Sequence, residues 1–244
     1  MIPRDALEAL VEAVGPQWVK HARAELDTYA TDGLPTHGSV PGAVVIPATK
    51  SELLQVIRVL YHYRIPAVAR GAGTGLSGGA LASDDAVLVV LTRLNRILEI
   101  DAQNRRAIVE PGVINAKLSA ATAPFGLHYA PDPSSQPVCT IGGNVAENAG
   151  GPHCLKYGVT TNHILALEVV LPHGETLCLG SASGEVWGPD LVGLFVGSEG
   201  TFGIATEITV RLTPTPTAIR TLLADFALLK SAGQAVTSII AAGF

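Results

Sequence analysis

The segment Arg70-Gly-Ala-Gly-Thr-Gly-Leu-Ser-Gly-Gly-Ala80 contains five glycines and directly follows the apolar run 65–69. Glycine adopts positive φ angles without steric cost and lets another group come close to the backbone. A loop so rich in glycine can turn its N–H groups outward as a concave nest that suits an anion, above all a phosphate. A tight surface turn needs fewer glycines, so the segment predicts a phosphate-binding loop at the end of a strand.

The residues before this loop predict a strand–helix–strand unit. Residues 44–47 and 67–70 are short apolar strands, and the second of them leads into the loop. Between them, Thr49 and Glu52 are spaced as the two members of a capping box, and apolar residues recur at helical spacing over 53–63. This order indicates a βαβ unit, whose crossover should be right-handed.

Downstream of the loop the pattern favours antiparallel hairpins. Two pairs of strand-like runs, each joined by a turn, predict hairpins at 97–110 and 164–179. A buried strand is expected at 86–91, and helices are expected at 114–125 and 190–195. Residues 204–212 predict a strand that alternates enough to have one solvated face.

Both ends of the chain are expected to lie outside this domain. Residues 1–39 are interpreted as a short helix outside the main fold followed by an extended polar lead-in, and residues 40–217 as the main domain. Thr213-Pro-Thr-Pro-Thr217 predicts a stiff linker that does not pair with a sheet. Residues 218–244 predict one strand at 222–226 and one helix at 227–242, which cannot bury their apolar faces alone. They are interpreted as the beginning of a second, truncated domain.

The composition excludes several kinds of partner and site. A hydrophobic fraction of 48% and a charged fraction of 15% over 244 residues indicate a globular chain with an ample core. The net charge of −5 gives no basic surface for nucleic acid, and the longest aliphatic run, 87–91, is too short to span a membrane. The three cysteines form no CxxC pair and the seven histidines no HxH or HxxxH pair. We therefore expect a cytoplasmic protein without a metal site.

Two further glycine-rich clusters follow the loop. Cys139-Thr-Ile-Gly-Gly-Asn-Val-Ala-Glu-Asn-Ala-Gly-Gly151 predicts a helical turn whose N-terminal amides favour an anion, with Asn144 and Asn148 on one face. Val196-Gly-Ser-Glu-Gly-Thr-Phe-Gly-Ile204 spaces its glycines so that backbone can lie against a flat partner. Separate glycine clusters in one domain favour a large phosphate-bearing cofactor over a small anion.

An NAD-binding Rossmann dehydrogenase is a minor alternative. Gly73-Thr-Gly-Leu-Ser-Gly78 is literally a GxGxxG motif, which requires a long helix that opens inside it. Only residues 79–85 separate the motif from the next strand, and Ser83-Asp-Asp85 is typical of a turn. The sequence context therefore contradicts this motif.

Taken in this order, the three clusters over residues 40–217 resemble the FAD-binding domain of the p-cresol methylhydroxylase (PCMH) and vanillyl-alcohol oxidase family. Within that family they are similar to the flavin subunits of glycolate oxidases (glycolate dehydrogenases) and to D-lactate and D-2-hydroxyglutarate dehydrogenases. The resemblance implies an α+β fold with a small βαβ subdomain, a larger subdomain on an antiparallel sheet, and FAD between them. It also implies oxidation of a small 2-hydroxy acid, glycolate or D-lactate, with hydride transfer to flavin N5.

The resemblance further implies which residues contact FAD. The first cluster would wrap the pyrophosphate, the second and the loop before it would line the ribityl and flavin region, and the third would hold the other face. The implied residues are Arg70, Gly71, Ala72, Gly73, Thr74, Gly75, Gly78, Gly79, Pro131, Asp132, Ser134, Thr140, Gly142, Gly143, Asn144, Asn148, Gly150, Gly151, Glu199, Gly203 and Ile204. The first loop contains no histidine that could be attached to FAD, so a non-covalent flavin is implied.

The resemblance carries no catalytic residue into this chain, because the relatives' catalytic residues lie in their C-terminal half. His153, just after the second cluster, is a candidate, since histidine titrates where proton abstraction needs it. A loop histidine bonded to backbone is the alternative, and Lys156 and Tyr157 are similarly placed. The chain is expected to be the FAD-binding portion of a dehydrogenase or an FAD-binding module without turnover. Iron–sulfur and second flavin subunits are possible partners by the same resemblance.

Overall fold

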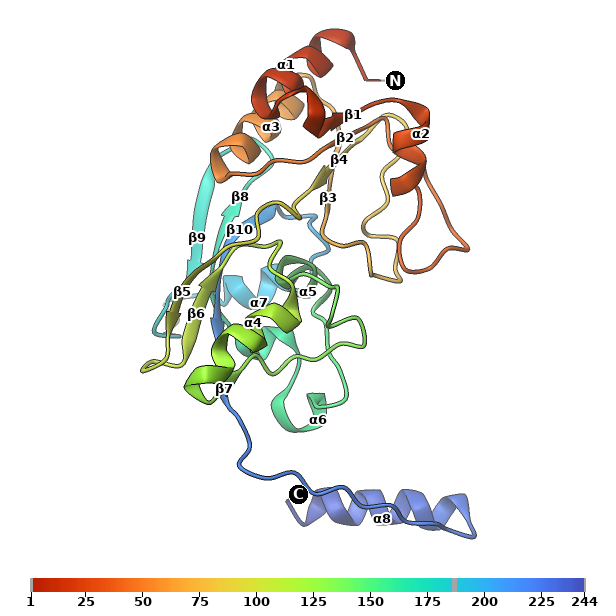
Figure 1. The fold of residues 1–244 in the computed structure, drawn as a ribbon, viewed down its shortest axis with the longest axis vertical. Helices are drawn as coiled ribbons and strands as arrows, with labels where there is room; N and C mark the ends of the chain where they lie inside the picture. The colour runs from red at the N-terminus through yellow and green to blue at the C-terminus, as the bar shows by residue number, and fades with distance from the viewer. Residues whose placement is uncertain (1, 186–187, 244) are drawn as a thin grey trace.

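The computed structural model describes residues 2–185 and 188–243 of the chain. Figure 1 shows a small sheet in the upper part of the molecule and a larger sheet below it, with the C-terminal helix apart from both. The small sheet has the strand order β1-β2-β4-β3. Its strands are β1 (Val19–Lys20), β2 (Ala43–Val45), β3 (Ala67–Arg70) and β4 (Val87–Val90).

The predicted strand–helix–strand unit is present as β2, α3 (Lys50–His62) and β3. Thr49 caps α3, and its side chain accepts a hydrogen bond from the Glu52 N–H at 3.1 Å. The Glu52 carboxylate accepts from the Ala48 N–H at 2.7 Å, one residue before the cap. Both β2 and β3 pair in parallel with β4, which lies between them. The glycine-rich loop therefore starts from β3, an edge strand of this sheet.

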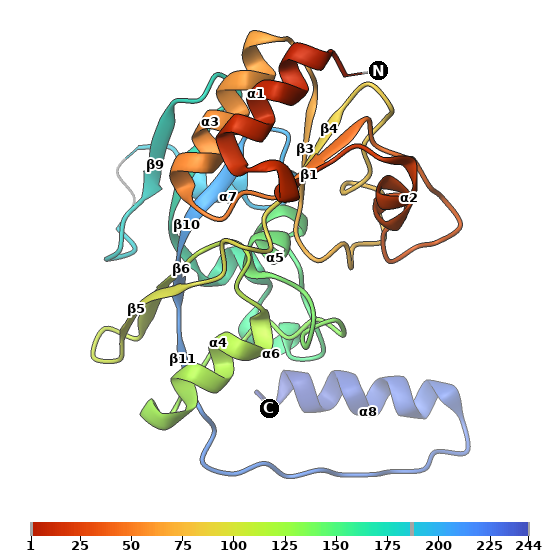
Figure 2. The same cartoon turned by 45° about the horizontal axis from the view of Figure 1, so that its top comes forward.

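The N-terminal helix α1 (Arg4–Val14) belongs to the core of the small subdomain. Ala6, Leu10 and Val14 are buried, and Figure 2 shows α1 lying along α3. The expectation that this helix lies outside the main fold is wrong, because its apolar stripe packs on that of α3. The lead-in is not simply extended either, since it contains β1 and α2 (Arg23–Leu26).

The larger sheet is antiparallel throughout and has the order β5-β6-β10-β8-β9. Its strands are β5 (Ile97–Asp101), β6 (Arg106–Val109), β8 (Ile164–Val170), β9 (Thr176–Gly180) and β10 (Ile204–Arg211). Both predicted hairpins, β5–β6 and β8–β9, are confirmed. The expected solvated face of β10 is wrong: β10 is the central strand, and only Glu207 and Arg211 are not buried.

Helices cover one face of the larger sheet and build a second core there. The helices of this part are α4 (Asn115–Thr122), α5 (Ile141–Glu147), α6 (Cys154–Tyr157) and α7 (Leu191–Phe195). Leu118, Ile141 and Phe195 pack with Ile208 of β10 in one buried cluster. Short 3-10 helices occur at Pro16–Trp18, Asp27–Tyr29, Ala123–Phe125 and Thr160–His163. The antiparallel sheet with its helices thus forms the larger subdomain expected from the resemblance.

The C-terminal segment differs from the sequence prediction in two places. Thr213–Pro214 forms β11, which pairs with β7 (Leu127–His128), although a linker without sheet pairing was expected. The proline is tolerated because this ladder has only two strands and needs few N–H donors. No strand forms at 222–226 among the described residues, and Leu222 and Leu223 are exposed. The predicted helix is confirmed as α8 (Leu229–Ala241), which stands apart from both sheets in Figures 1 and 2.

No helix in the part of the chain that the structure describes is long and apolar enough to cross a membrane.

Candidate functional site

All three glycine-rich clusters meet around one cavity of about 310 Å³, between β3, α5 and the loop before β10. A volume near the lower end of the usual range of about 300–1,000 Å³ suits part of a larger ligand. Most of the first cluster lines it, together with residues of the second and third. The lining residues are Ala69, Gly71, Ala72, Gly73, Thr74, Gly75, Leu76, Ser77, Gly79, Ala80, Ser135, Cys139, Thr140, Gly143, Asn144, Ala146, Glu147, Ala149, Glu199 and Gly200.

Two glycines of the loop are required by close approach of other groups. A Cβ atom on Gly71 would collide with the Thr140 hydroxyl, so this glycine lets the loop lie against the start of α5. Gly73 has φ +69°, and a Cβ atom there would collide with the guanidinium of Arg70. Both positions therefore need glycine for steric reasons, and the first brings two clusters into contact.

The loop presents backbone N–H groups that have no protein acceptor among the described residues. The N–H groups of Ala72, Gly73, Thr74 and Gly75 are in this position, and all four residues line the cavity. Backbone N–H groups away from water are almost always bonded, so these donors need solvent or a ligand as their acceptor. A row of such donors in a glycine loop matches the oxygens of a phosphate or pyrophosphate.

The second cluster does not offer its amides in the expected way. The Gly142 N–H donates to the Pro111 carbonyl at 2.8 Å, and the Gly143 N–H donates to the Thr140 hydroxyl at 3.2 Å. These donors at the start of α5 are already used within the protein. Gly142 is instead required by packing, since a Cβ atom there would lie 2.6 Å from the Pro111 Cβ. Anion binding is thus left to the amides of the first cluster.

The Arg70 side chain does not line the cavity. Its guanidinium is buried and donates to the carbonyl groups of Thr31 at 2.8 Å and Ala80 at 3.2 Å. Burial lowers the pKa of Arg70, and the nearby charge of Asp32 opposes this shift. Arg70 therefore holds the loop in place through hydrogen bonds on the side away from the cavity, and it does not contact a ligand in the cavity.

The two asparagines of the second cluster do not share one ligand-facing side. Asn144 is buried, and its Oδ1 accepts from Asn115 Nδ2 at 2.9 Å, which also donates to the Pro131 carbonyl at 2.9 Å. Asn148 ends α5 in the left-handed region with φ 48°, and its side chain accepts from the Thr161 N–H at 3.0 Å. Both side chains hold the loops around the cavity, and the buried Asn115 was not predicted from the sequence.

Five expected residues in the loops after β7 and after α5 do not line the cavity, although Ser135 and Ala149 of the same loops do. This group comprises the expected residues Pro131, Asp132, Ser134, Gly150 and Gly151. A Cβ atom on Gly151 would collide with the Asp132 carbonyl. His153 Nδ1 lies 2.5 Å from the Asp132 carboxylate, and the His153 side chain remains 67% exposed. These two loops form one unit next to the cavity.

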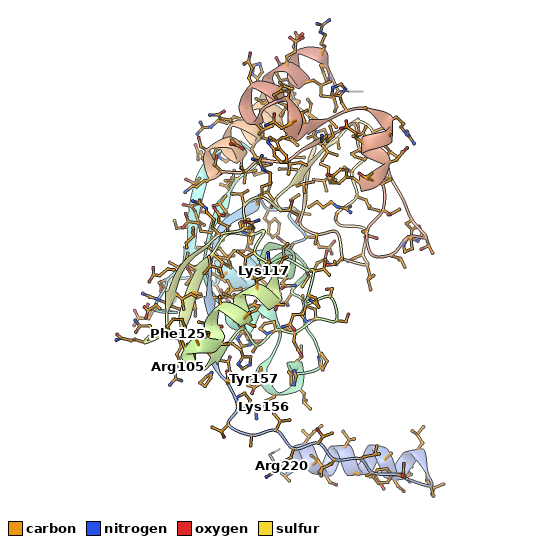
Figure 3. The ribbon with its side chains drawn as sticks, viewed as in Figure 1. Arg105, Lys117, Phe125, Lys156, Tyr157 and Arg220 are labelled. Atoms are coloured by element: carbon orange, nitrogen blue, oxygen red, sulfur yellow. The ribbon has the colours of Figure 1, made fainter. Side chains whose placement is uncertain are left out.

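The secondary candidates Lys156 and Tyr157 lie on α6, away from the cavity. Figure 3 shows both on the side of the molecule toward α8. Lys156 Nζ lies 5.6 Å from the centre of the Tyr157 ring. Neither side chain is among those that line the cavity.

A second cavity of about 780 Å³ adjoins the first, and both are lined by Ala69 and Gly200. It contains two expected residues, Gly203 and Ile204, and runs along the free edge of β3. The Pro66 carbonyl accepts a hydrogen bond from Val87 of β4, and the Arg70 carbonyl accepts one from Leu91, the residue after β4. Because bonding directions alternate along a strand, Ala67 and Ala69 direct their backbone groups toward this cavity.

The first cavity also contains two carboxylates. Glu147 accepts a hydrogen bond from the Ser77 hydroxyl at 2.9 Å, which ties α5 to the glycine loop. Glu199 adopts φ 53°, and its N–H donates to the Ala146 carbonyl at 2.9 Å, which ties the third cluster to α5. The sequence analysis predicted neither Ser77 nor Glu147 as a site residue. Glu147 could have been found, because it is a charged residue within a glycine-rich cluster.

The Rossmann alternative from the sequence finds no support in the geometry. No helix lies between β3 and β4, so the GxGxxG motif does not open a Rossmann helix. Among residues 2–185 and 188–243, no three His, Cys, Asp or Glu side chains are grouped as metal ligands.

Comparison with known proteins gives a family match and close relatives. Residues 41–180 match the family described as FAD binding domain. Glycolate oxidase subunit GlcD of Escherichia coli K12 is 49% identical over 97% of this chain and 48% of its own length. The Bacillus subtilis 168 protein of the same name is 42% identical over 99% of this chain and 52% of its own length. D-lactate dehydrogenase of Archaeoglobus fulgidus is 33% identical over 96% of the chain and 52% of its own length.

Solved structures share the fold. An alkyldihydroxyacetonephosphate synthase superposes with a TM-score of 0.79 at 22% identity, over 89% of this chain and 42% of its own. A p-cresol methylhydroxylase with bound substrate gives a TM-score of 0.74 at 21% identity, over 88% and 44%. The chain spans about half the length of the curated relatives that it matches. It belongs to the FAD-binding domain family and has the PCMH-type fold, with FAD as its cofactor.

Proposed function

From this family membership, we propose that the chain is the FAD-binding portion of a flavin-dependent D-2-hydroxyacid dehydrogenase that oxidises glycolate or D-lactate. The observation that carries the proposal is that the N–H groups of Ala72–Gly75 have no acceptor in the described part of the chain, while these four residues line a cavity built jointly by all three glycine clusters. Relatives named for glycolate oxidation and D-lactate oxidation support the substrate class.

In this proposal the amides of Ala72–Gly75 hold the pyrophosphate of FAD. The donors of the loop supply hydrogen bonds from the backbone alone. Glycines at positions 71 and 73 keep the loop close to Thr140 and Arg70, and a larger side chain at either position would deform it. The loop thus fits a diphosphate through its backbone.

The two ends of FAD would lie on opposite sides of this loop. The cavity along the free edge of β3 offers backbone groups of Ala67 and Ala69, together with Gly203 and Ile204, to the adenosine end. The flavin end would lie toward Thr140 and the joined loops that carry Asp132 and Gly151. The adjoining cavities provide one continuous path for an extended dinucleotide.

When bound, the flavin supplies the acceptor for the hydride that leaves the α-carbon of the hydroxy acid. The residues of this chain bind and orient the cofactor. His153 with its Asp132 partner is a group that could hold a proton beside the flavin end, and it remains a minor candidate.

Three finer features belong to the same proposal. The flavin is held without a covalent bond, since the glycine loop has no histidine. The full protein works with other subunits, for which the word subunit in the names of two relatives is the support. Iron–sulfur and second flavin proteins are the proposed partners. A cytoplasmic location suits the three cysteines, which are free thiols.

The test is a binding titration of the purified chain with FAD and, separately, with NAD. We expect saturable quenching of flavin fluorescence at one FAD per chain and no comparable binding of NAD. Acid precipitation should release all the flavin into solution. A chain that takes up no FAD, or that binds NAD tightly in its place, would refute the proposed function, whereas flavin that stays with the precipitate would refute only non-covalent binding.

A binding module without turnover is the second candidate for the chain as it stands. The observation that favours it is its span, about half the length of the matching relatives. The decisive measurement is oxidation of glycolate or D-lactate by the FAD-loaded chain, with an artificial dye as electron acceptor. Absence of turnover, together with stoichiometric FAD, would support this candidate, and turnover by the chain alone would exclude it.

A further inference from the structure

The glycine loop is supported by a second segment, which we call the outer strip and define as Tyr29-Ala-Thr-Asp-Gly-Leu34. None of its residues lines the cavity of about 310 Å³. The Gly33 N–H donates to the Gly75 carbonyl at 2.9 Å. A Cβ atom on Gly33 would lie 2.7 Å from the Thr74 carbonyl oxygen, so the two backbones are in direct contact. The strip therefore backs the part of the loop that carries the unpaired amides.

Asp32 joins the outer strip to the loop through one carboxylate oxygen and bonds within the strip through the other. Asp32 Oδ2 accepts a hydrogen bond from the Gly78 N–H at 3.0 Å, and Oδ1 accepts from the Leu34 N–H at 2.8 Å. Gly78 has φ +80°, so this bond holds a turn that few other residues could form. The carboxylate thus takes up one loop amide and leaves those of Ala72–Gly75 for a ligand.

Arg70 completes the support from the other side of the strip. Its guanidinium donates to the Thr31 carbonyl in the strip and to the Ala80 carbonyl at the end of the loop. It also lies 5.9 Å from the centre of the Tyr29 ring. The start of the loop, its end and the outer strip are therefore fixed to one buried cation.

We propose that Asp32 is a positioning residue that sets the glycine loop for the pyrophosphate of FAD without touching the cofactor. The inference rests on the proposed function, because it assigns the ligand of the loop. It extends the FAD site to the outer strip, which sequence reasoning treated as a lead-in outside the domain.

The direction in which FAD affinity changes when Asp32 is replaced distinguishes a positioning role from a purely electrostatic one. A carboxylate near a pyrophosphate repels it, so loss of the Asp32 charge alone would tighten FAD binding. Loss of the hydrogen bond to the Gly78 N–H would loosen the loop and weaken FAD binding. Asparagine at position 32 removes the charge and replaces one acceptor oxygen with a donor. A positioning role therefore predicts weaker binding in spite of the lost repulsion.

The experiment compares the full chain with its Asp32→Asn variant by titration with FAD and with riboflavin, which lacks the pyrophosphate. We expect about a tenfold loss of FAD affinity, the size that loss of one charge-assisted hydrogen bond produces. Riboflavin affinity should stay within about twofold, because it does not use the loop. The matched control is Asp27→Asn, an exposed carboxylate just before the outer strip that pairs with Arg23 at 2.9 Å, and its FAD affinity should not change.

Hydrogen exchange of the ligand-free chain supplies a readout that does not depend on FAD. Residues 71–80 should exchange faster in Asp32→Asn than in the unmodified chain or in Asp27→Asn. Gly33→Ala forces the backbones of the outer strip and the loop apart, so its residues 71–80 should also exchange faster. This second variant keeps the test valid if Asp32→Asn fails to fold. Unchanged exchange, tighter FAD binding, or an equal loss of FAD and riboflavin affinity would overturn the proposal. Faster exchange in a chain that does not bind FAD would refute the proposed function alone.

Discussion

At the scale of single residues, glycines serve different purposes in the three clusters. Gly71 and Gly73 give room to Thr140 and Arg70, whereas Gly142 gives room to Pro111. Only the first two shape the part of the cavity with unpaired amides. A glycine in a ligand-binding motif can therefore be required by the protein and not by the ligand.

Gly73→Ala should lower FAD affinity by at least about tenfold. Alanine at φ +69° is strained, at a cost of about 1 kcal/mol, and its Cβ would collide with the Arg70 guanidinium. A flavin fluorescence titration measures the affinity.

Gly126→Ala is the matched control for this substitution. Gly126 has φ +68° and lies outside both cavities, and a Cβ atom at this position would have no atom within 4 Å. The substitution should lower stability by a similar strain and leave FAD affinity unchanged. Equal loss of affinity in both variants would show that general destabilisation, and not the shape of the loop, is responsible.

His163 should make the protein less stable in mild acid. The side chain is buried, its Nε2 lies 2.9 Å from the Tyr157 carbonyl, and burial lowers its pKa below the ordinary value. At a pH below the unfolded pKa of about 6.5, the unfolded state binds a proton that the folded state does not take up. The free energy of unfolding therefore falls as the pH drops through this value toward the lower folded pKa.

Urea unfolding at a series of pH values between about 5 and 7.5 measures this dependence. His163→Gln should flatten the acid side of the curve, although the variant is less stable overall. The exposed His62, replaced by glutamine, is the control variant. If the free energy of unfolding of His163→Gln falls with decreasing pH as steeply as that of the unmodified chain, other groups cause the acid sensitivity.

At the scale of elements, α1 is part of the small subdomain. Leu10 is 0% exposed and packs in the same cluster as Leu53 and Val56 of α3. The sequence pattern predicted the helix but not its place, because an amphipathic stripe shows that a helix has a partner without naming the partner.

Leu10→Ala should therefore destabilise the protein by about 3 kcal/mol, the usual cost of a cavity left by a buried leucine. Thermal unfolding followed by circular dichroism measures this loss. Leu7→Ala, in the same helix at a partly buried position, should cost clearly less. A loss of under about 1 kcal/mol for Leu10→Ala would instead indicate a helix that is only loosely attached.

At the scale of the whole molecule, the subdomains share buried contacts beside the FAD site. Val170 of β8 and Ile204 of β10 belong to the core of the small subdomain, and Lys50 of α3 pairs with Glu168 of β8 at 2.5 Å. The cavities lie along this boundary, with walls from β3 on one side and from α5 or β10 on the other.

FAD should consequently stabilise the chain as one cooperative unit. At a free concentration one hundred times its dissociation constant, binding to the folded state adds about 2.7 kcal/mol. Thermal melts with increasing FAD should show a single transition that rises steadily, while NAD leaves it unchanged. Two separate transitions, of which only one responds to FAD, would show that the cofactor does not bridge the subdomains.

Much of the local structure follows from the sequence alone. The Thr49 cap, both hairpins and the position of the glycine loop after β3 were predictable, because they depend on residues close together in the chain. The order of the three clusters also identified the family. The extra pairing of β11 and the burial of β10 were not predictable, since they depend on distant partners.

The sequence by itself determined that this chain binds a phosphate-bearing cofactor, because glycine spacing sets where backbone can bend and be approached. Only the tertiary structure decided which amides are free to bind it. The Gly142 donor is taken by Pro111, and the Gly78 donor is taken by Asp32, 46 residues earlier in the chain. Hydrogen-bond partners so distant in sequence meet only through folding, so no local pattern records them.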